Sequence, residues 1–162
     1  MGGSEGERRE SGGAGVIVAS RLKSGKMKSD TYAEWDTEET ILAVESAIKL
    51  YHRVTLIEAD EEAYQKLLAV RPDIVFNIAE GLNGPSREAQ IPAILEFLDI
   101  SYTGSDPVTL GICLDKSRTK EILSYHGIPT PAFSVIESLK DPLTLQFPLP
   151  AIVKPLHEGS SK

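Results

Sequence analysis

Lys154 draws attention first, because it directly follows a short apolar run and precedes a loop rich in glycine and serine. Residues 151 to 153 predict a β-strand, and the loop at 158 to 161 reads Glu-Gly-Ser-Ser. Its backbone N–H groups and hydroxyls could surround an anion, and a lysine beside them would add charge. The alternative is a solvated lysine before an ordinary turn, and the residues alone favour that alternative.

Lys116 is a second lysine in a position where an anion would be useful. It stands in the first turn of a predicted helix, directly after Asp115 as the N-cap. A cation there opposes the helix dipole at a cost of about 0.3 to 1 kcal/mol, and a bound phosphate would reverse the sign. The alternative is a solvated lysine paired with Glu121 or its neighbours.

Two common nucleotide-binding motifs are missing from the sequence. The glycines at 12, 13 and 15 precede or open the first apolar run, whereas a dinucleotide fingerprint follows a strand. Gly25-Lys26 is followed by Met27, where a P-loop needs serine or threonine. A dinucleotide-binding dehydrogenase and a P-loop enzyme are therefore both disfavoured.

The elements that must position these lysines follow from the alternation of apolar and amphipathic segments. Strands are expected at 15 to 19, 54 to 57 and 74 to 78, with helices at 36 to 52, at 61 to 70 and from 86 onward. The expected inward residues of the first two helices are Ile41, Val44, Ile48, Tyr51, Tyr64, Leu67 and Leu68. Asp36 is the expected N-cap of the first helix, in a capping box with Glu39.

Such alternation predicts an α/β fold, with a small parallel sheet between helices on both faces. The strand at 15 to 19 is expected in the centre. The loops at 20 to 35 and 80 to 86 should then lie at the same edge, where open α/β sheets bind ligands.

The second half of the chain is expected to begin another unit. A helix at 116 to 125 is closed by Gly127, and strands are predicted at 133 to 136 and at 151 to 153. We divide the chain into a disordered tail at 1 to 13, a domain at 14 to 108 and the truncated start of a second domain at 109 to 162. On a scale of ~100 to 200 residues per domain, this indicates a piece of a longer protein.

Composition argues against several classes of protein. The chain of 162 residues has a net charge of −7 and no long basic run, which disfavours nucleic-acid binding. No segment is apolar enough for a signal peptide or a membrane span, so a cytoplasmic protein without a membrane partner is expected. The single Cys113 is expected in the core, and the three histidines lack metal-ligand spacing.

Residues 73 to 120, taken together with 153 to 161, resemble the N-terminal half of the D-alanine–D-alanine ligase family of ATP-grasp enzymes. The resemblance covers most of residues 31 to 162. It implies a Rossmann-like N-terminal domain of the kind that precedes the ATP-grasp domain, called a pre-ATP-grasp domain. The start of an ATP-grasp central domain would follow it. The resemblance also implies a bacterial ATP-dependent ligase that joins two D-amino acids through an acyl phosphate for peptidoglycan precursors. The family's Mg²⁺ ligands would lie in a C-terminal part beyond this sequence, so the 162-residue chain alone is expected to be inactive.

The same resemblance implies roles for individual residues. The residues expected to contact the nucleotide are Lys116, Lys154, Glu158, Gly159 and Ser161. Glu34 and Ser160 would face the first amino acid, with Glu39 as the rival carboxylate. Glu80 and Gly81 stand where many members have His-Gly, so they are expected near the substrate with a different charge. Lys120 is read as a solvated lysine, and a homodimer is a further expectation.

Two other functions stay open. One is an ATP-grasp ligase with a different acid and amine, and the other is a non-catalytic binding or regulatory domain. A panel of amino acids tested for ADP release would separate the two ligases. Catalytic residues beyond Lys162 would argue against a regulatory domain.

Overall fold

The sheet of the computed structural model is parallel and small. The structure describes residues 15–19, 37–138, 140 and 147–159 of the chain. In this part, the strands are β1 (Gly15–Ala19), β2 (Arg53–Ile57), β3 (Ile74–Asn77) and β4 (Ser101–Tyr102). Their order is β2-β1-β3-β4, and β1 pairs in parallel with both β2 and β3. The predicted central strand is therefore confirmed.

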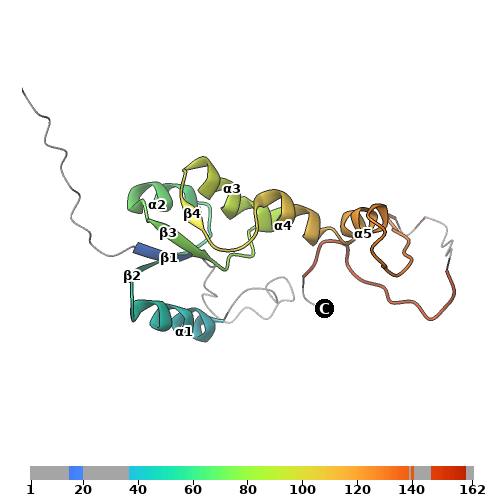
Figure 1. Ribbon diagram of the computed structural model, residues 1–162, viewed down its shortest axis with the longest axis horizontal. Helices are drawn as coiled ribbons and strands as arrows, with labels where there is room; N and C mark the ends of the chain where they lie inside the picture. Colours follow the sequence, from blue (N-terminus) through green and yellow to red (C-terminus); the bar gives the residue numbers. More distant parts are fainter. Residues whose placement is uncertain (1–14, 20–36, 139, 141–146, 160–162) are drawn as a thin grey trace, which may run out of the picture.

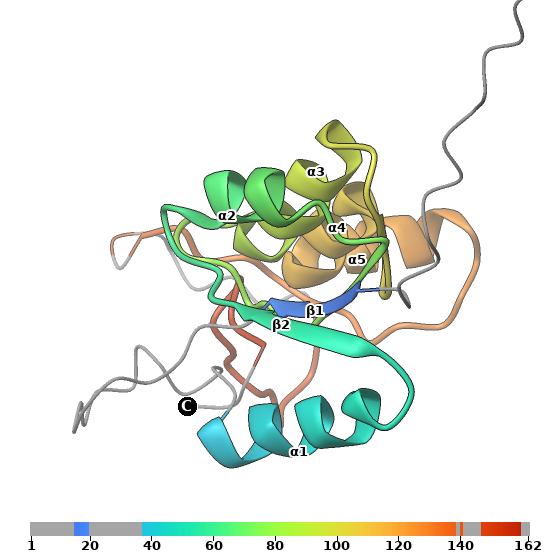
Figure 2. The ribbon, with the colours of Figure 1, turned by 90° about the vertical axis from the view of Figure 1, so that its left-hand side faces the viewer.

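Helices cover both faces of this sheet, as the alternation predicted (Figure 2). Helix α1 (Glu38–Lys49) lies on one face, while α2 (Ala63–Val70) and α3 (Gln90–Phe97) lie on the other. The described residues from 15 to 102 are called the sheet lobe below. Helices α4 (Pro107–Leu114) and α5 (Lys116–Tyr125) lead away from it. The described residues after α5, called the C-terminal segment below, run beside α5 (Figure 1).

The core of the sheet lobe lies between the sheet and the pair α2 and α3. Leu67, Val75 and Leu95 have no exposed surface, and each such side chain contributes roughly 1.5 to 3 kcal/mol through its burial. Around them the core cluster contains Ile57, Ala59, Ala63, Ile91, Leu98 and Ile100. These residues hold β3 rigid, and the loop that follows β3 starts from this fixed point.

The prediction that Tyr51 and Leu68 face inward is wrong. Tyr51 is 81% exposed, because α1 ends at Lys49 and the turn that follows leaves the helical face. Leu68 is 41% exposed, since its neighbour Leu67 takes the buried position of α2. Ile41 and Leu67 are buried as predicted.

The helix starts show which capping patterns were read correctly. The N-cap of α1 is Thr37, whose hydroxyl accepts from the N–H of Thr40 at 3.2 Å, so the predicted cap at Asp36 is corrected by one residue. Asp106 caps α4 with Pro107 at its first position, and Asp115 caps α5. Asp115 is the predicted cap of α5, and Asp106 followed by Pro107 is likewise the cap and first-turn pattern that the sequence indicates for α4.

The strands predicted at 133 to 136 and 151 to 153 are not formed. Both segments are irregular, and Ile136, Ile152 and Val153 are 50%, 83% and 91% exposed. A strand exists only through pairing with another strand, and neither segment has a partner strand among the described residues. The apolar runs alone were therefore insufficient.

None of the described helices has the length and apolar character that crossing a membrane requires.

Candidate functional site

The carboxyl ends of β1 and β3 form the edge of the sheet where a ligand site is expected. Ala19 and Asn77, the last residues of these strands, are partners in the register. β2 and β3 lie on opposite sides of β1, so the strand order reverses at β1. Open α/β sheets bind ligands at such a switch point. The loop after β1, with the predicted residue Glu34, lies outside the described residues.

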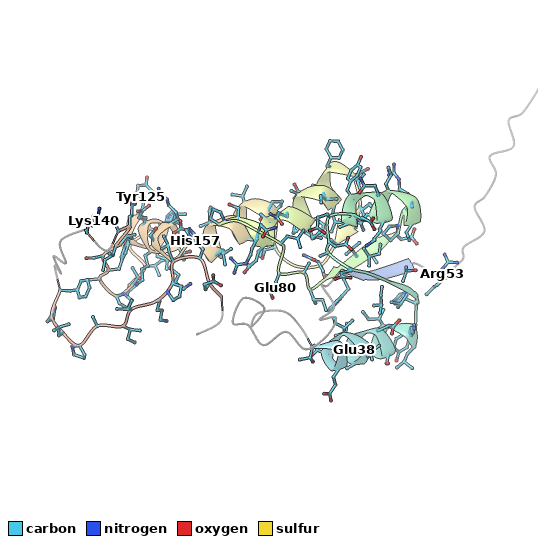
Figure 3. All side chains as sticks on the ribbon, turned by 180° about the vertical axis from the view of Figure 1, so that it is seen from behind. Glu38, Arg53, Glu80, Tyr125, Lys140 and His157 are labelled. Carbon is cyan, nitrogen blue, oxygen red and sulfur yellow. The ribbon has the colours of Figure 1, made fainter. Side chains whose placement is uncertain are left out.

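The loop after β3 carries Glu80 and Gly81 and folds back on itself. Glu80 is half-buried and lies at the end of the sheet opposite to Arg53 (Figure 3). Gly81 has φ +73°, and a Cβ atom there would lie 1.9 Å from the carbonyl oxygen of Arg87. Only glycine fits this close approach. Gln90 closes the loop by accepting from Leu82 N–H at 3.1 Å.

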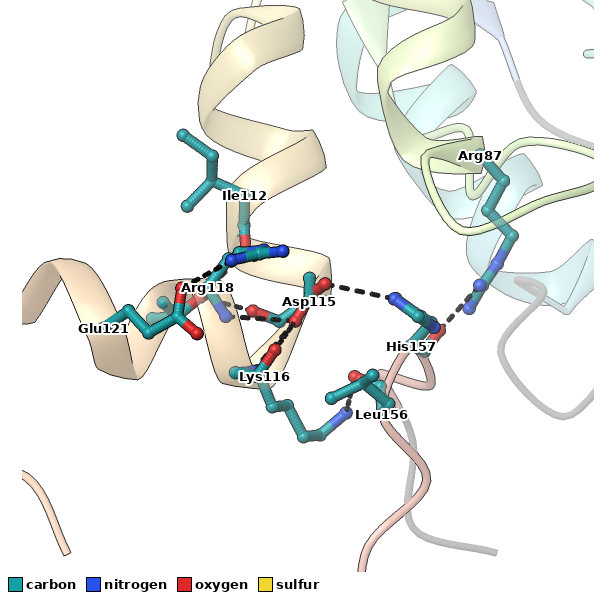
Figure 4. A network of polar contacts seen from close by, with 10 residues as sticks. Arg87, Ile112, Asp115, Lys116, Arg118, Glu121, Leu156 and His157 are labelled. Atoms are coloured by element: carbon teal, nitrogen blue, oxygen red, sulfur yellow. Dashed lines mark hydrogen bonds and ion pairs between the residues drawn. The ribbon is translucent and has the colours of Figure 1, made fainter. Parts of the chain in front are cut away.

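Lys116 contacts the chain that follows Lys154. Its ammonium donates to the carbonyl oxygens of Glu158 and, at 3.4 Å, of Leu156 (Figure 4). Its backbone N–H also donates to the Leu156 carbonyl at 3.2 Å. The predicted alternative, a pair with Glu121, is not formed, because the carboxylate of Glu121 lies 2.8 Å from Arg118.

Asp115 links the start of α5 to the same stretch of chain. Its Oδ1 accepts from the N–H groups of Ser117 and Arg118 at 2.9 and 3.0 Å, and its Oδ2 lies 3.2 Å from His157 Nε2. The Ser117 hydroxyl, then the Arg118 N–H and His157, lower the pKa of Asp115 to about 2. The carboxylate is therefore ionised at neutral pH and holds both the helix and the loop.

Arg87 reaches the same stretch from the sheet lobe. It begins the short 3₁₀ helix η2 (Arg87–Ala89), which packs against α4. Its guanidinium donates to the His157 carbonyl at 2.7 Å and lies 3.5 Å from the Glu158 carboxylate (Figure 4). Sequence reasoning missed this residue. Its place in the same loop as Glu80 was the one available signal.

A pocket of about 820 Å³ lies between α5 and the C-terminal segment. Phe133, Ile152 and several prolines give it apolar walls, and Lys116, Lys120 and Lys154 are also among its lining residues. Cys113 also lines this pocket and is exposed, so the predicted core position of Cys113 is wrong. Apolar walls with clustered cations suit an anionic ligand that carries a planar ring.

Lys120 differs from its predicted solvated state. It is half-buried and donates to Thr130 Oγ1 at 3.1 Å and to the Pro131 carbonyl at 2.8 Å. Its ammonium lies 5.5 Å from the ring centre of Phe133. Lys120 thus holds one wall of the pocket in place.

Comparisons with known proteins identify relatives of the chain. No family model matches it. The D-alanine–D-alanine ligase of Aquifex aeolicus is 40% identical over 121 residues, which are 74% of this chain and 41% of that protein. The ligase of the same name from Sphingopyxis alaskensis is 37% identical over 114 residues, or 68% of this chain and 35% of that protein. Over its matched part, the chain belongs to the D-alanine–D-alanine ligase family.

A solved structure shows that the fold agrees. The D-alanine–D-alanine ligase from Bacillus anthracis, complexed with ATP, matches with a TM-score of 0.56 over 80% of this chain and 40% of that chain. At 24% identity this match concerns the fold. It supports the predicted class, a small parallel sheet between helices. The chain spans about 41% of its A. aeolicus relative, and the position of its domain boundary stays a prediction.

The structure brings together part of the site that resemblance to the D-alanine–D-alanine ligase family predicted. Lys116 and Lys154 line one pocket, and Glu158 contacts Lys116 through its carbonyl oxygen. Gly159 follows directly, whereas the predicted residues Ser160 and Ser161 lie outside the described residues. Glu39, the rival of Glu34, is exposed in the first turn of α1. The described residues contain no group of three or more side chains suited to a metal ion.

Proposed function

We propose that the complete protein is an ATP-dependent ligase that joins two D-amino acids for peptidoglycan precursors. The observation that carries the proposal is the pocket with apolar walls that Lys116 and Lys154 both line. Its relatives named D-alanine–D-alanine ligase support the same reaction type. D-Alanine is the expected substrate, the cytoplasm the expected location, and a homodimer the expected assembly.

The pocket fits a nucleotide in size and chemistry. Its volume of about 820 Å³ falls within the range of ~300 to 1,000 Å³ that small-molecule sites occupy. The walls at Phe133 and Ile152 suit a planar base, and the lysines suit phosphate oxygens. When bound, ATP supplies the phosphoryl group that activates a substrate carboxylate, and Mg²⁺ reduces the charge on that group. The Mg²⁺ ligands are expected in the rest of the complete protein.

Lys116 can bind a nucleotide while it keeps its contacts with residues 156 and 158. An ammonium group has three N–H donors, and two of them reach the carbonyl oxygens of Leu156 and Glu158. The third can donate to a phosphate oxygen. A phosphate there would also offset the unfavourable position of a cation at the start of α5.

The amino-acid substrates are expected at the carboxyl edge of the sheet. Glu34 would bind the ammonium group of the first amino acid, and Ser160 would lie near its carboxylate. Glu80, at the end of the sheet, would add a negative charge to this edge. A carboxylate favours a second ammonium group, so a ligase with a different amino acid in one position is the second candidate function.

A single assay separates these functions. The complete protein is incubated with ATP, Mg²⁺ and each of a panel of D- and L-amino acids, and ADP release is measured. The main proposal predicts release that requires D-alanine. Release with another acid and amine supports the second candidate, and no release with any amino acid contradicts both.

A further inference from the structure

Arg87 connects the loop after β3 to the chain that follows Lys154. Its guanidinium contacts the His157 carbonyl at 2.7 Å and the Glu158 carboxylate at 3.5 Å. The Arg87 side chain is 13% exposed and the Glu158 side chain 33% exposed. An exposed ion pair contributes little, but a shielded guanidinium that also binds a backbone carbonyl fixes the position of the main chain.

The backbone of Arg87 is itself held in place. Gly81 approaches its carbonyl oxygen so closely that no side chain fits between them. The Arg87 N–H donates to the Gly84 carbonyl at 3.3 Å, and η2 packs against α4. The guanidinium therefore extends from a fixed point on the sheet lobe.

The stretch 156–158, called the tethered segment below, is held from its other side by the start of α5. Lys116 binds the carbonyl oxygens of Leu156 and Glu158, while Asp115 contacts the ring of His157. With the Arg87 contact, three successive carbonyl oxygens have partners. Because the C=O and N–H of a trans peptide point in opposite directions, the N–H groups that follow each carbonyl are oriented too.

We propose that Arg87 is a positioning residue for Glu158 and Gly159, two residues assigned to the nucleotide, because it ties the tethered segment to the loop after β3. The Gly-Ser-Ser stretch assigned to phosphate begins directly after Glu158. The position of the described residues that lead into this stretch therefore depends on a residue of the sheet lobe. The nucleotide part of this inference rests on the proposed function, whereas the order of the tethered segment does not.

The first test measures backbone order in the 162-residue chain. Order parameters from ¹⁵N relaxation are compared at residues 157 to 159 in the wild type, Arg87→Met and Arg87→Lys. Values near ~0.85 indicate a rigid backbone and values below ~0.6 a flexible one. We expect Arg87→Met to move these amides from the rigid to the flexible range and Arg87→Lys to keep them close to the wild type.

Arg118→Met is the matched control, because the exposed Arg118 side chain pairs with Glu121 and not with the tethered segment. It should leave residues 157 to 159 unchanged. The amides of α2 report whether the core survives. If Arg87→Met disrupts α2, Arg87→Gln decides instead, since it keeps a polar side chain but removes the charge and is too short to reach the His157 carbonyl. Unchanged order at 157 to 159 in the deciding variant overturns the inference.

The second test concerns the nucleotide in the complete protein. Loss of a charge-assisted hydrogen bond corresponds to about tenfold or more in affinity. Arg87→Met should raise the KM for ATP about tenfold with a kcat change below about threefold, and Arg87→Lys should restore most of the KM. An equal KM in Arg87→Met and wild type overturns the nucleotide part of the inference. If the wild type binds no ATP while the order parameters change as expected, the proposed function fails and the tether is supported.

Discussion

The guanidinium of Arg87 lies 2.7 Å from the carbonyl oxygen of His157, although 70 positions separate the two residues in the chain. This contact joins the loop at the carboxyl edge of the sheet to the segment that leads into the Gly-Ser-Ser stretch. If the complete protein has the proposed function, a short chain of contacts therefore fixes the amino-acid site relative to the nucleotide site. This chain of contacts runs through Gly81, Arg87 and the tethered segment.

Gly81→Ala should destabilise the sheet lobe more than Gly84→Ala. Both glycines have positive φ, +73° and +90°, so both substitutions carry backbone strain of about 1 to 2 kcal/mol. Only at position 81 would the new Cβ meet the Arg87 backbone, at 1.9 Å, while position 84 has open space. We expect a further loss of at least about 2 kcal/mol in Gly81→Ala. Urea unfolding of the 162-residue chain measures both, and equal losses would contradict this account of Gly81.

The stability of the chain should fall as the pH drops from about 4 to 2, partly because of Asp115. Its folded pKa is lowered to about 2 from the ordinary value of 3.8, chiefly by the Ser117 hydroxyl. The ionised carboxylate therefore stabilises the folded state above pH 4, and this contribution is lost as protonation proceeds toward pH 2. Asp115→Asn keeps a capping side chain but does not titrate, so its unfolding free energy should fall less steeply in this range. Urea unfolding at several pH values checks this, and parallel profiles would argue against it.

Much of the sheet lobe could be predicted because its signals are local. Apolar runs marked β1 and β3, and Asp106 and Asp115 are N-caps whose partners lie within three residues. The prediction of a strand at 151 to 153 was wrong, because a strand needs a partner that can lie far away in the sequence. The apolar run alone did not show whether such a partner exists. Arg87 was missed for the same reason, since a polar residue in a loop gives no sign of a contact 70 positions away.

Lys154→Met should weaken ATP binding in the complete protein about tenfold or more, because it removes a charge-assisted bond to a phosphate. Lys140 provides the matched control. It is exposed in the same C-terminal segment and does not line the pocket. Calorimetric titration with ATP and Mg²⁺ measures both variants. Equal losses of affinity would remove Lys154 from the nucleotide site.

Bound ATP should protect Cys113 from alkylation. The thiol is exposed and lines the same pocket as Lys116 and Lys154. In the complete protein, the iodoacetamide reaction at this position, followed by mass spectrometry of its peptide, should slow several-fold with saturating ATP. A Cys113→Ser variant identifies the signal. An unchanged rate at saturating ATP would place the nucleotide elsewhere.

Glu34→Gln should raise the KM for the first amino acid about tenfold, because a neutral amide cannot pair with an ammonium group. Glu39→Gln is its matched comparison, since Glu39 is exposed on α1 and is the rival carboxylate. Steady-state kinetics of the complete protein with each variant measures the effect. A large rise in Glu39→Gln and none in Glu34→Gln would transfer the role to Glu39.

In the proposed reaction, ATP activates the carboxylate of one amino acid before a second amine attacks it. One carboxylate oxygen then passes to the phosphate that is released. The complete protein is therefore incubated with ATP, Mg²⁺ and D-alanine labelled with ¹⁸O in its carboxylate, and the phosphate is analysed by mass spectrometry. We predict one ¹⁸O atom in the phosphate for each ADP and dipeptide formed, whereas ADP formation with unlabelled phosphate would contradict the account.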